Sequence, residues 1–258
     1  MARKPPRPAQ KKKPMRNVLV SGASRGLGLA IACKLAAAGY CVIALARQPS
    51  KELTAAIAES NKQQRGAVHF VAFDLGRVAE IPDMVRKLRQ EFGPLFGLVN
   101  NAALGLDGAL AMMHNSQIEE LVRINTLSPM VLTKYVVRAM MSEGSGRIVN
   151  VGSIVATTGY SGLSVYAATK SAMIGFTRSL AREVGRLGIN VNAIAPGFLD
   201  TAMTHGLAGE QRQQVLRRSA LRRLADVEDV ADAVEYLLGE KARNITGTVI
   251  TVDAGATA

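Results

Sequence analysis

Tyr166 and Lys170 stand four positions apart in the stretch Tyr166-Ala167-Ala168-Thr169-Lys170. On a helix, residues at this spacing lie on the same face, so the phenol and the ammonium would share one small volume. A free tyrosine has a pKa of roughly 10, and a nearby ammonium stabilises the phenolate and lowers that pKa. Tyr166 would then donate and accept a proton near neutral pH. An ordinary surface pair has the same spacing, so other residues must decide between the two interpretations.

Another polar residue, Ser153, follows an expected strand at 147–151 and precedes Tyr166 by thirteen positions. Ligands of open α/β sheets bind beyond the carboxyl ends of the strands. At such an end, Ser153 could bond a carbonyl oxygen and help to fix Tyr166, although serine is also common in turns. Asn125 lies in an expected helix at 116–127, an interior position that helix propensity disfavours for asparagine.

A glycine-rich turn lies between an expected strand at 17–20 and an expected helix. It reads Ser21-Gly22-Ala23-Ser24-Arg25-Gly26-Leu27-Gly28, and a second apolar strand at 41–46 follows the helix. Glycines let the backbone approach a pyrophosphate, and the N-terminus of the helix favours its negative charge. The sequence therefore predicts a dinucleotide site at this turn.

The residues after the second strand indicate which dinucleotide binds. An acidic residue there would bond the ribose 2′-hydroxyl of NAD, whereas arginine accommodates the 2′-phosphate of NADP. The chain has Ala46-Arg47 at this point, and its first acidic residue is Glu52. Arg25, inside the glycine turn, is a second candidate for the same phosphate. We predict NADP(H) as the cofactor; the alternative is that Arg47 is a solvated charge at a strand end.

The spacing Gly-x3-Gly-x-Gly, with Ser21 before its first glycine, resembles the short-chain dehydrogenase/reductase family. Asn125, Ser153, Tyr166 and Lys170 match the four positions of that family's catalytic set in order and spacing. The resemblance implies that Asn125 bends its helix and holds a water that connects the lysine to solvent; the alternative is an ordinary mid-helix asparagine. It also implies that Lys170 binds the nicotinamide ribose.

The same resemblance implies a set of cofactor contacts. They are Gly22, Ser24, Arg25, Gly26, Leu27, Gly28, Arg47, Asp74, Leu75, Asn101, Ala102, Tyr166, Lys170, Pro196, Gly197 and Thr201. Asp74 would contact the adenine edge, with a turn or a helix cap as its alternative role. Thr201 would bond the carboxamide or a phosphate. Ala103 stands where the family usually has glycine, and we expect it to tune the site without removing a chemical group.

Within this family, three stretches are similar to the 3-oxoacyl-[acyl-carrier-protein] reductases of fatty-acid synthesis, namely residues 22–26, 179–184 and 195–198. The expected reaction is therefore the NADPH-dependent reduction of a 3-oxoacyl thioester on acyl carrier protein. An acidic carrier would be attracted to a basic patch. Candidates, unless they are simply solvated helix faces, are Arg178, Arg182, Arg186, Arg217 and Arg218. The turn at 142–145 is Ser-Glu-Gly-Ser, not basic as it often is in those reductases, which weakens the docking argument.

Two alternatives stay open. One is an NADP-dependent oxidoreductase that acts on another alcohol, sugar or ketone. The other is a protein that binds nucleic acid or a partner through its basic N-terminal residues and keeps the fold as a scaffold. The complete set of four catalytic positions argues against the second alternative.

Strands alternate with helices along residues 17–258. This pattern predicts an α/β fold of Rossmann type, a doubly wound parallel sheet of about seven strands with helices on both faces. The further expected strands are residues 67–72, 97–99, 147–151, 190–194 and 248–252. We expect a single domain with a substrate lid at about 199–223. The resemblance implies a homodimer or homotetramer that pairs the helices at 130–141 and 166–185.

Residues 1–16 contain seven basic residues, four prolines and no acid, and they supply much of the formal net charge of +12. Such a segment cannot bury an apolar face, so we expect a disordered arm that either binds a polyanion or is a solvated tail. It has no apolar segment of a secretory signal, and no run of about 20 apolar residues follows that could span a membrane. Cys33 and Cys41 are expected to be reduced core residues of a cytoplasmic protein. The three histidines have no metal-binding spacing, so we expect no metal site.

Overall fold

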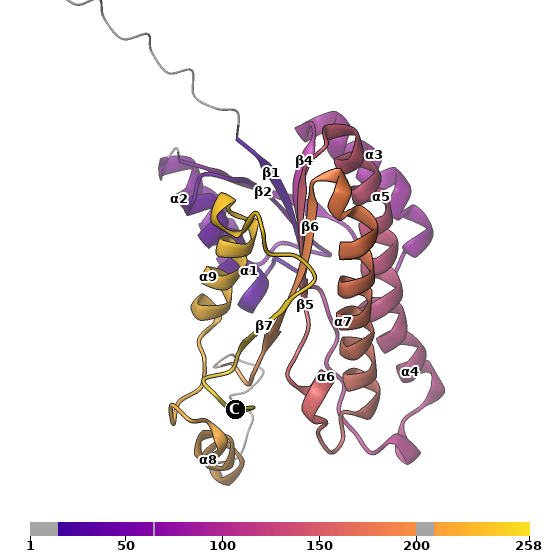
Figure 1. Ribbon diagram of the computed structural model, residues 1–258, viewed down its shortest axis with the longest axis vertical. Helices are drawn as coiled ribbons and strands as arrows, with labels where there is room; N and C mark the ends of the chain where they lie inside the picture. The colour runs from indigo at the N-terminus through magenta and orange to yellow at the C-terminus, as the bar shows by residue number, and fades with distance from the viewer. Residues whose placement is uncertain (1–14, 64, 200–208) are drawn as a thin grey trace, which may run out of the picture.

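The computed structural model describes residues 15–63, 65–199 and 209–258. In this part of the chain, seven strands form one parallel sheet in the order β3-β2-β1-β4-β5-β6-β7 (Figure 1). The strands are β1 (Asn17–Ser21), β2 (Cys41–Ala46), β3 (Ala67–Ala72), β4 (Leu95–Asn100), β5 (Gly146–Val151), β6 (Ile189–Pro196) and β7 (Val249–Val252). The strand order reverses between β1 and β4, which is where ligands bind in sheets of this type. The predicted fold class is confirmed.

Helices cover both faces of the sheet (Figure 1). One face carries α1 (Gly26–Ala37), α2 (Lys51–Gln63) and α9 (Val227–Leu238). The other face carries α3 (Ile81–Phe92), α5 (Ser128–Glu143) and α7 (Ser164–Val184). Shorter helices near the carboxyl ends of the strands are α4 (Asn115–Val122), α6 (Val155–Thr158) and α8 (Gly209–Arg218) (Figure 1).

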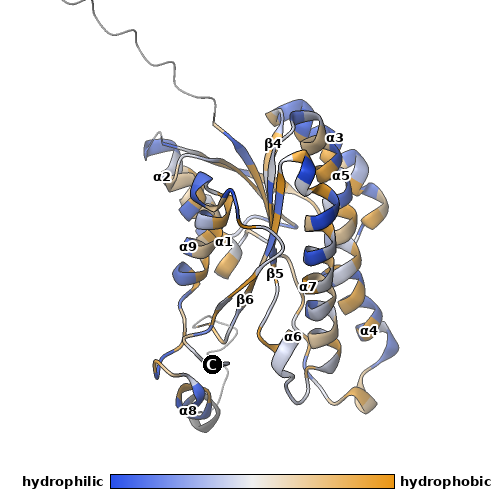
Figure 2. Ribbon diagram, in the orientation of Figure 1, coloured by the Kyte–Doolittle hydropathy of each residue, from blue (hydrophilic) through white to orange (hydrophobic). Residues whose placement is uncertain are grey.

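The alternation of side chains along β1 shows why both faces need helices. Val18 and Val20 point into the core under α1 and α9, while Leu19 points into the core under α3, α5 and α7, and all three are fully buried. A strand buried on both faces has a continuous apolar sequence. Complete burial of each such side chain contributes about 1.5–3 kcal/mol. Figure 2 shows the result, an apolar centre with hydrophilic outer faces on the helices.

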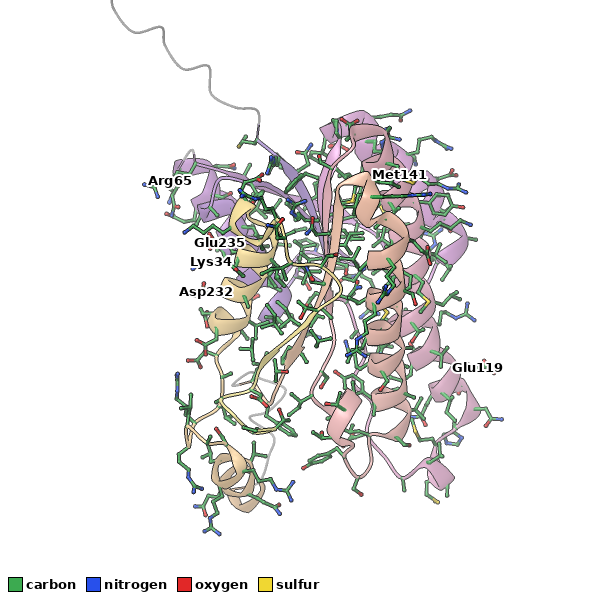
Figure 3. All side chains as sticks on the ribbon, in the orientation of Figure 1. Lys34, Arg65, Glu119, Met141, Asp232 and Glu235 are labelled. Atoms are coloured by element: carbon green, nitrogen blue, oxygen red, sulfur yellow. The ribbon has the colours of Figure 1, made fainter. Side chains whose placement is uncertain are left out.

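Polar contacts cap the start of α9 and connect this helix to α1. Asp226 and Asp229 form a reciprocal capping box at the start of α9. Lys34 of α1 makes ion pairs with Asp232 and Glu235 of α9 (Figure 3). These two carboxylates raise the pKa of Lys34, the hydrogen bond to Asp232 being the largest cause.

Several sequence-based expectations need correction. The disordered arm was expected to include Arg16. The Arg16 guanidinium instead lies 4.1 Å from the centre of the Phe96 ring and pairs with Glu240, so Arg16 is part of the folded domain. Residues 1–14 of the arm lie outside the described part of the chain. The expected lid contains α8, and its residues 200–208 are outside the described part as well. Cys33 is exposed, not a core residue, whereas Cys41 is buried, and both thiols are free.

The described residues contain neither a membrane-spanning helix nor a cluster of metal ligands. No helix among them is both long enough and apolar enough to cross a membrane. No three His, Cys, Asp or Glu side chains among them come together in a way that could hold a metal ion.

Candidate active site

Tyr166 and Lys170 lie side by side near the start of α7, on the same helix face. The Lys170 Nζ atom lies 5.6 Å from the centre of the Tyr166 ring. The same ammonium donates a hydrogen bond of 2.9 Å to the carbonyl oxygen of Val151, the last residue of β5. The pair is therefore held at the carboxyl end of a central strand.

Burial shifts the pKa of both groups. Lys170 is only 4% exposed, and loss of hydration lowers the pKa of its ammonium from 10.5 to about 8. Burial also raises the pKa of the Tyr166 phenol above its usual value of 10, while a hydrogen bond with Ser153 acts in the opposite direction. The lower phenol pKa expected from the neighbouring lysine is thus not seen in the protein alone, because desolvation of the phenolate dominates.

Ser153 is placed by the ends of β5 and β6. The hydrogen bonds that hold this turn run from the Gly152 N–H to the Ile194 oxygen, at 2.7 Å, and from the Ile154 N–H to the Pro196 oxygen, at 3.0 Å. The Ser153 Oγ atom accepts a hydrogen bond of 3.3 Å from the Val155 N–H. Since this N–H occupies one acceptor site of the hydroxyl, the Ser153 proton is free to point at the Tyr166 oxygen.

Asn125 lies in a π-helical turn, Arg123–Leu127, between α4 and α5. Such turns interrupt α-helices and are frequent at functional sites. The Asn125 Oδ1 atom accepts a hydrogen bond of 2.8 Å from the Leu104 N–H, and its Nδ2 atom donates to the Leu104 oxygen at 2.9 Å. Nδ2 also donates to the Thr169 hydroxyl at 3.2 Å. The distorted helix expected at Asn125 is present, and its amide joins the loop after β4 to the residue next to Lys170.

The glycine turn has the shape that a pyrophosphate needs. Gly22 and Gly26 have φ angles of +67° and +55°, which favour glycine. A Cβ atom on Gly28 would lie 2.2 Å from the Gly22 oxygen, so this position must lack a side chain for α1 to approach β1. Around Gly26, by contrast, a Cβ would meet no atom within 4 Å, which leaves the outer side of the turn open.

The N-terminus of α1 next to this turn can receive an anion. Its N-cap, Arg25, makes no side-chain capping hydrogen bond, and the first turn of the helix contains no acidic residue. Free N–H groups and the positive end of the helix dipole favour phosphate at such a position. The turn therefore fits the pyrophosphate of a dinucleotide.

Ser21 has a structural role that the sequence analysis missed. Its hydroxyl accepts hydrogen bonds from the backbone N–H groups of Asn101 and Ala102, at 3.0 and 3.1 Å. The Asn101 Nδ2 atom donates in return to the backbone oxygens of Ser21 and Gly22, at 3.0 and 3.2 Å. The Asn101 side chain, which was expected to contact the cofactor, thus uses its amide in the protein alone to hold the glycine turn. The signal in the sequence is a serine at the end of an expected strand, directly before the first glycine of the turn.

Arg25 and Arg47 are both exposed, on the loops that follow β1 and β2. The Ser50 hydroxyl joins these loops, since it donates to the Ser24 oxygen at 2.5 Å and accepts from the Leu53 N–H at 3.0 Å. No acidic residue stands at the end of β2. The loops therefore fit a 2′-phosphate better than a free 2′-hydroxyl.

Of the remaining residues expected to contact the cofactor, three have local contacts in the structure and one lies outside the described part of the chain. Asp74 accepts a hydrogen bond of 2.9 Å from the Gly76 N–H, which is the turn role given as its alternative. Leu75 is buried, and its carbonyl oxygen accepts a hydrogen bond from Ser128 at 2.7 Å. Gly197 lies so close to Asp253 that a Cβ would stand 2.7 Å from the Asp253 Cβ. Thr201 lies outside the described residues.

Comparison with known proteins agrees with this geometry. A model of the family described as short chain dehydrogenase matches residues 16–212. The 3-oxoacyl-[acyl-carrier-protein] reductase FabG of Escherichia coli (strain K12) is 40% identical over 238 residues, which cover 92% of this chain and 95% of that protein. The reductase of the same name from Vibrio cholerae is 38% identical over 239 residues, with 92% and 95% covered.

Solved structures show the same architecture. A short chain dehydrogenase from Burkholderia cenocepacia J2315, in complex with NADP, has a TM-score of 0.86 and 34% identity, with 95% of this chain and 98% of that chain covered. A putative gluconate dehydrogenase from Agrobacterium tumefaciens has a TM-score of 0.89 and 26% identity, with 94% and 96% covered.

Proposed function

Because this chain belongs to the short-chain dehydrogenase family, we propose that it uses NADPH to reduce the carbonyl group of a 3-oxoacyl thioester to a hydroxyl, with the substrate carried on acyl carrier protein. The observation that carries the proposal is the placement of Ser153, Tyr166 and Lys170 at the end of β5, on the edge of the sheet that also holds the glycine turn. Relatives named for this reaction match nearly the whole chain.

NADPH supplies the hydride when it is bound. The Ser153 hydroxyl donates a hydrogen bond to the substrate carbonyl oxygen and stabilises the negative charge that develops there. Tyr166 delivers its proton to the same oxygen; since its pKa is raised, the phenol is protonated at neutral pH. Lys170 then lies beside the phenolate that remains, and its positive charge stabilises that anion.

Asn125 acts through its neighbours. Its hydrogen bonds to Leu104 and Thr169 keep the loop after β4 and the helix α7 at a fixed separation. The cofactor is held by the glycine turn, with its 2′-phosphate between Arg25 and Arg47. Residues 17–258 form the reductase domain, with the lid at 199–223, and two or four copies assemble through α5 and α7.

The acidic carrier meets exposed arginines. Arg178 and Arg182 lie on α7, Arg186 lies in the short turn Gly185–Leu187 directly after it, and Arg217 and Arg218 lie on α8. The helix α5 extends through Glu143, further than the expected turn at 142–145, and neither its last two residues nor Gly144-Ser145 is basic, so this region adds nothing to the attraction. Docking on this chain therefore depends on the two helices.

A second candidate is an NADP-dependent oxidoreductase that acts on a sugar or another alcohol. It is favoured by the structural likeness to the putative gluconate dehydrogenase and by the absence of basic residues at the end of α5 and in the turn after it, residues 142–145. NADPH oxidation with acetoacetyl thioesters, compared with simple ketones and with NADP reduction by gluconate, separates the two candidates. Absence of thioester reduction would reject the first.

The assigned proton donor has its own test. We expect Tyr166→Phe to lose at least 100-fold in kcat, the contribution of about 10²–10⁴ typical of a positioned acid. Its NADPH affinity, measured by fluorescence titration, should stay within a few-fold of the wild type. A variant that keeps its turnover would refute the role of Tyr166.

A further inference from the structure

Large apolar side chains are exposed around the catalytic edge of the sheet. Leu110 is 56% exposed, Met112 is 81% exposed and Tyr160 is 42% exposed. The first two lie in the short turn Leu110–Met112 before α4, which Figure 2 shows in the hydrophobic colour at the lower right. Exposed apolar side chains that gather at one place mark a surface that something apolar covers.

Two loops that carry these side chains are joined to each other. The Gly108 N–H donates a hydrogen bond of 2.9 Å to the Gly162 oxygen. Gly162 has a φ angle of +81°, and a Cβ there would lie 3.7 Å from the Gly108 nitrogen. The loop before α4 and the loop between α6 and α7 therefore form one connected wall.

The wall continues to the end of β6 through an aromatic pair. The rings of Tyr160 and Phe198 lie edge to face, with their centres 5.6 Å apart and their planes at 61°. Phe198 follows Pro196-Gly197, and the Pro196 oxygen accepts the hydrogen bond from Ile154, the residue after Ser153. We call Leu110, Met112, Tyr160 and Phe198 the apolar rim.

The apolar rim lies on loops that lead to residues of the candidate active site. Its first loop starts at Leu104, which Asn125 holds, and its second loop leads directly into Tyr166 on α7. Near β7, at the other end of the same edge, most of the exposed residues are basic. Four of the seven residues at 217–223 are arginines, and the Leu221 N–H in this segment bonds to the Ala254 oxygen after β7.

We propose that the apolar rim binds the acyl chain of the substrate and selects medium-length and longer 3-oxoacyl thioesters over acetoacetyl thioesters. The inference rests on the proposed function. A thioester substrate has an apolar end, the acyl chain, and a polar end, the carrier. The rim offers apolar surface on the loops that flank Ser153 and Tyr166 in the chain, and the arginine-rich segment offers cations to the phosphate-bearing arm of the carrier.

The expected size of the selection follows from the burial of methylene groups. Each fully buried methylene strengthens binding by about four-fold. A 3-oxooctanoyl chain has four methylenes more than an acetoacetyl group. Since the rim is open to solvent, the four methylenes should contribute less than half of the binding free energy of full burial. We therefore predict a kcat/KM about ten-fold higher for the C8 thioester than for the C4 thioester.

The test measures the ratio of kcat/KM between C8 and C4 thioesters of coenzyme A, with NADPH. Met112→Ser/Tyr160→Ser should reduce this ratio to near one, and Met112→Ser alone should reduce it in part. Met141→Ser is the matched control, because Met141 is 48% exposed but lies at the far end of the helices (Figure 3). It should leave the ratio unchanged.

The possible failures are distinguishable. Reduction of C4 and C8 thioesters with equal kcat/KM in the wild type would overturn the apolar rim and leave the proposed function intact. No reduction of any thioester would overturn both. If the double variant changed the sedimentation mass but not the C8:C4 ratio, the rim would be a contact between subunits, and the inference would be wrong.

Discussion

Replacing Lys170 with methionine should make the protein inactive but more stable at neutral pH. Burial lowers the pKa of Lys170 from 10.5 to about 8, so the folded state holds the ammonium at a cost of about 3 kcal/mol at pH 7, at 1.36 kcal/mol per pKa unit. Methionine keeps most of the apolar stem and removes this cost. It also loses the hydrogen bond to the Val151 oxygen, which is worth about 1 kcal/mol. The expected net gain in unfolding free energy is about 2 kcal/mol.

The pH dependence tests the cause. Below pH 8, lysine is protonated in both the folded and the unfolded state, so the full cost is present. Between about pH 8 and pH 10.5, the unfolded state binds more protons, and the stability contributed by this site rises with pH. The advantage of Lys170→Met should therefore shrink from about 2 kcal/mol at pH 7.0 to near zero at pH 9.5.

Urea unfolding of the cofactor-free protein at both pH values measures this difference. The comparison between variant and wild type cancels the other groups that titrate in this range, such as Cys41, whose pKa burial raises. Lys87→Met, which removes one exposed charge from α3, is the control. A variant less stable than the wild type by the same amount at both pH values would show that the ammonium is not held at a cost. Loss of activity together with higher stability would show that this site is maintained for function.

Two further predictions concern the cofactor site. Gly28→Ala should lose NADPH binding and unfold at a lower urea concentration, because its Cβ would stand 2.2 Å from the Gly22 oxygen. Gly175→Ala, in the open middle of α7, should instead gain up to about 1 kcal/mol of stability. NADPH titration and urea unfolding measure both variants, and equal behaviour of the two would contradict the packing argument. Arg47→Asp should lower the ratio of NADPH to NADH in kcat/KM at least ten-fold, because an acid at the end of β2 repels the 2′-phosphate; an unchanged ratio would leave the phosphate to Arg25 alone.

Local patterns in the chain predicted the frame of the site. Apolar runs and helix stops marked the strands and helices, with bounds a few residues short at strands such as β4 and β6. The spacing of Tyr166 and Lys170 predicted that they share a helix face, and they do. The glycine turn predicted the close approach that the Gly28 contacts show. These features depend on neighbours within a few residues, which is why the sequence was sufficient.

Other features connect residues that are far apart in the chain. Asn125 bonds to Leu104 and Thr169, and the Ser21 hydroxyl joins the end of β1 to the segment after β4, 80 residues later. Such contacts depend on the strand order, which places β4 next to β1 and β5 next to β4. No spacing rule in the sequence specifies that order.

The sequence by itself determined the candidate catalytic groups, the glycine turn and the helix that carries Tyr166 and Lys170. Only the tertiary structure decided their environment. It set the pKa of Lys170 to about 8 and raised the pKa of Tyr166, because desolvation depends on what the whole fold packs around each group. It also brought Met112, Tyr160 and Phe198, from three separate segments, to one edge of the sheet. Burial and the joining of distant loops are properties of the packed chain, so they appear only once the sheet and its helices are assembled.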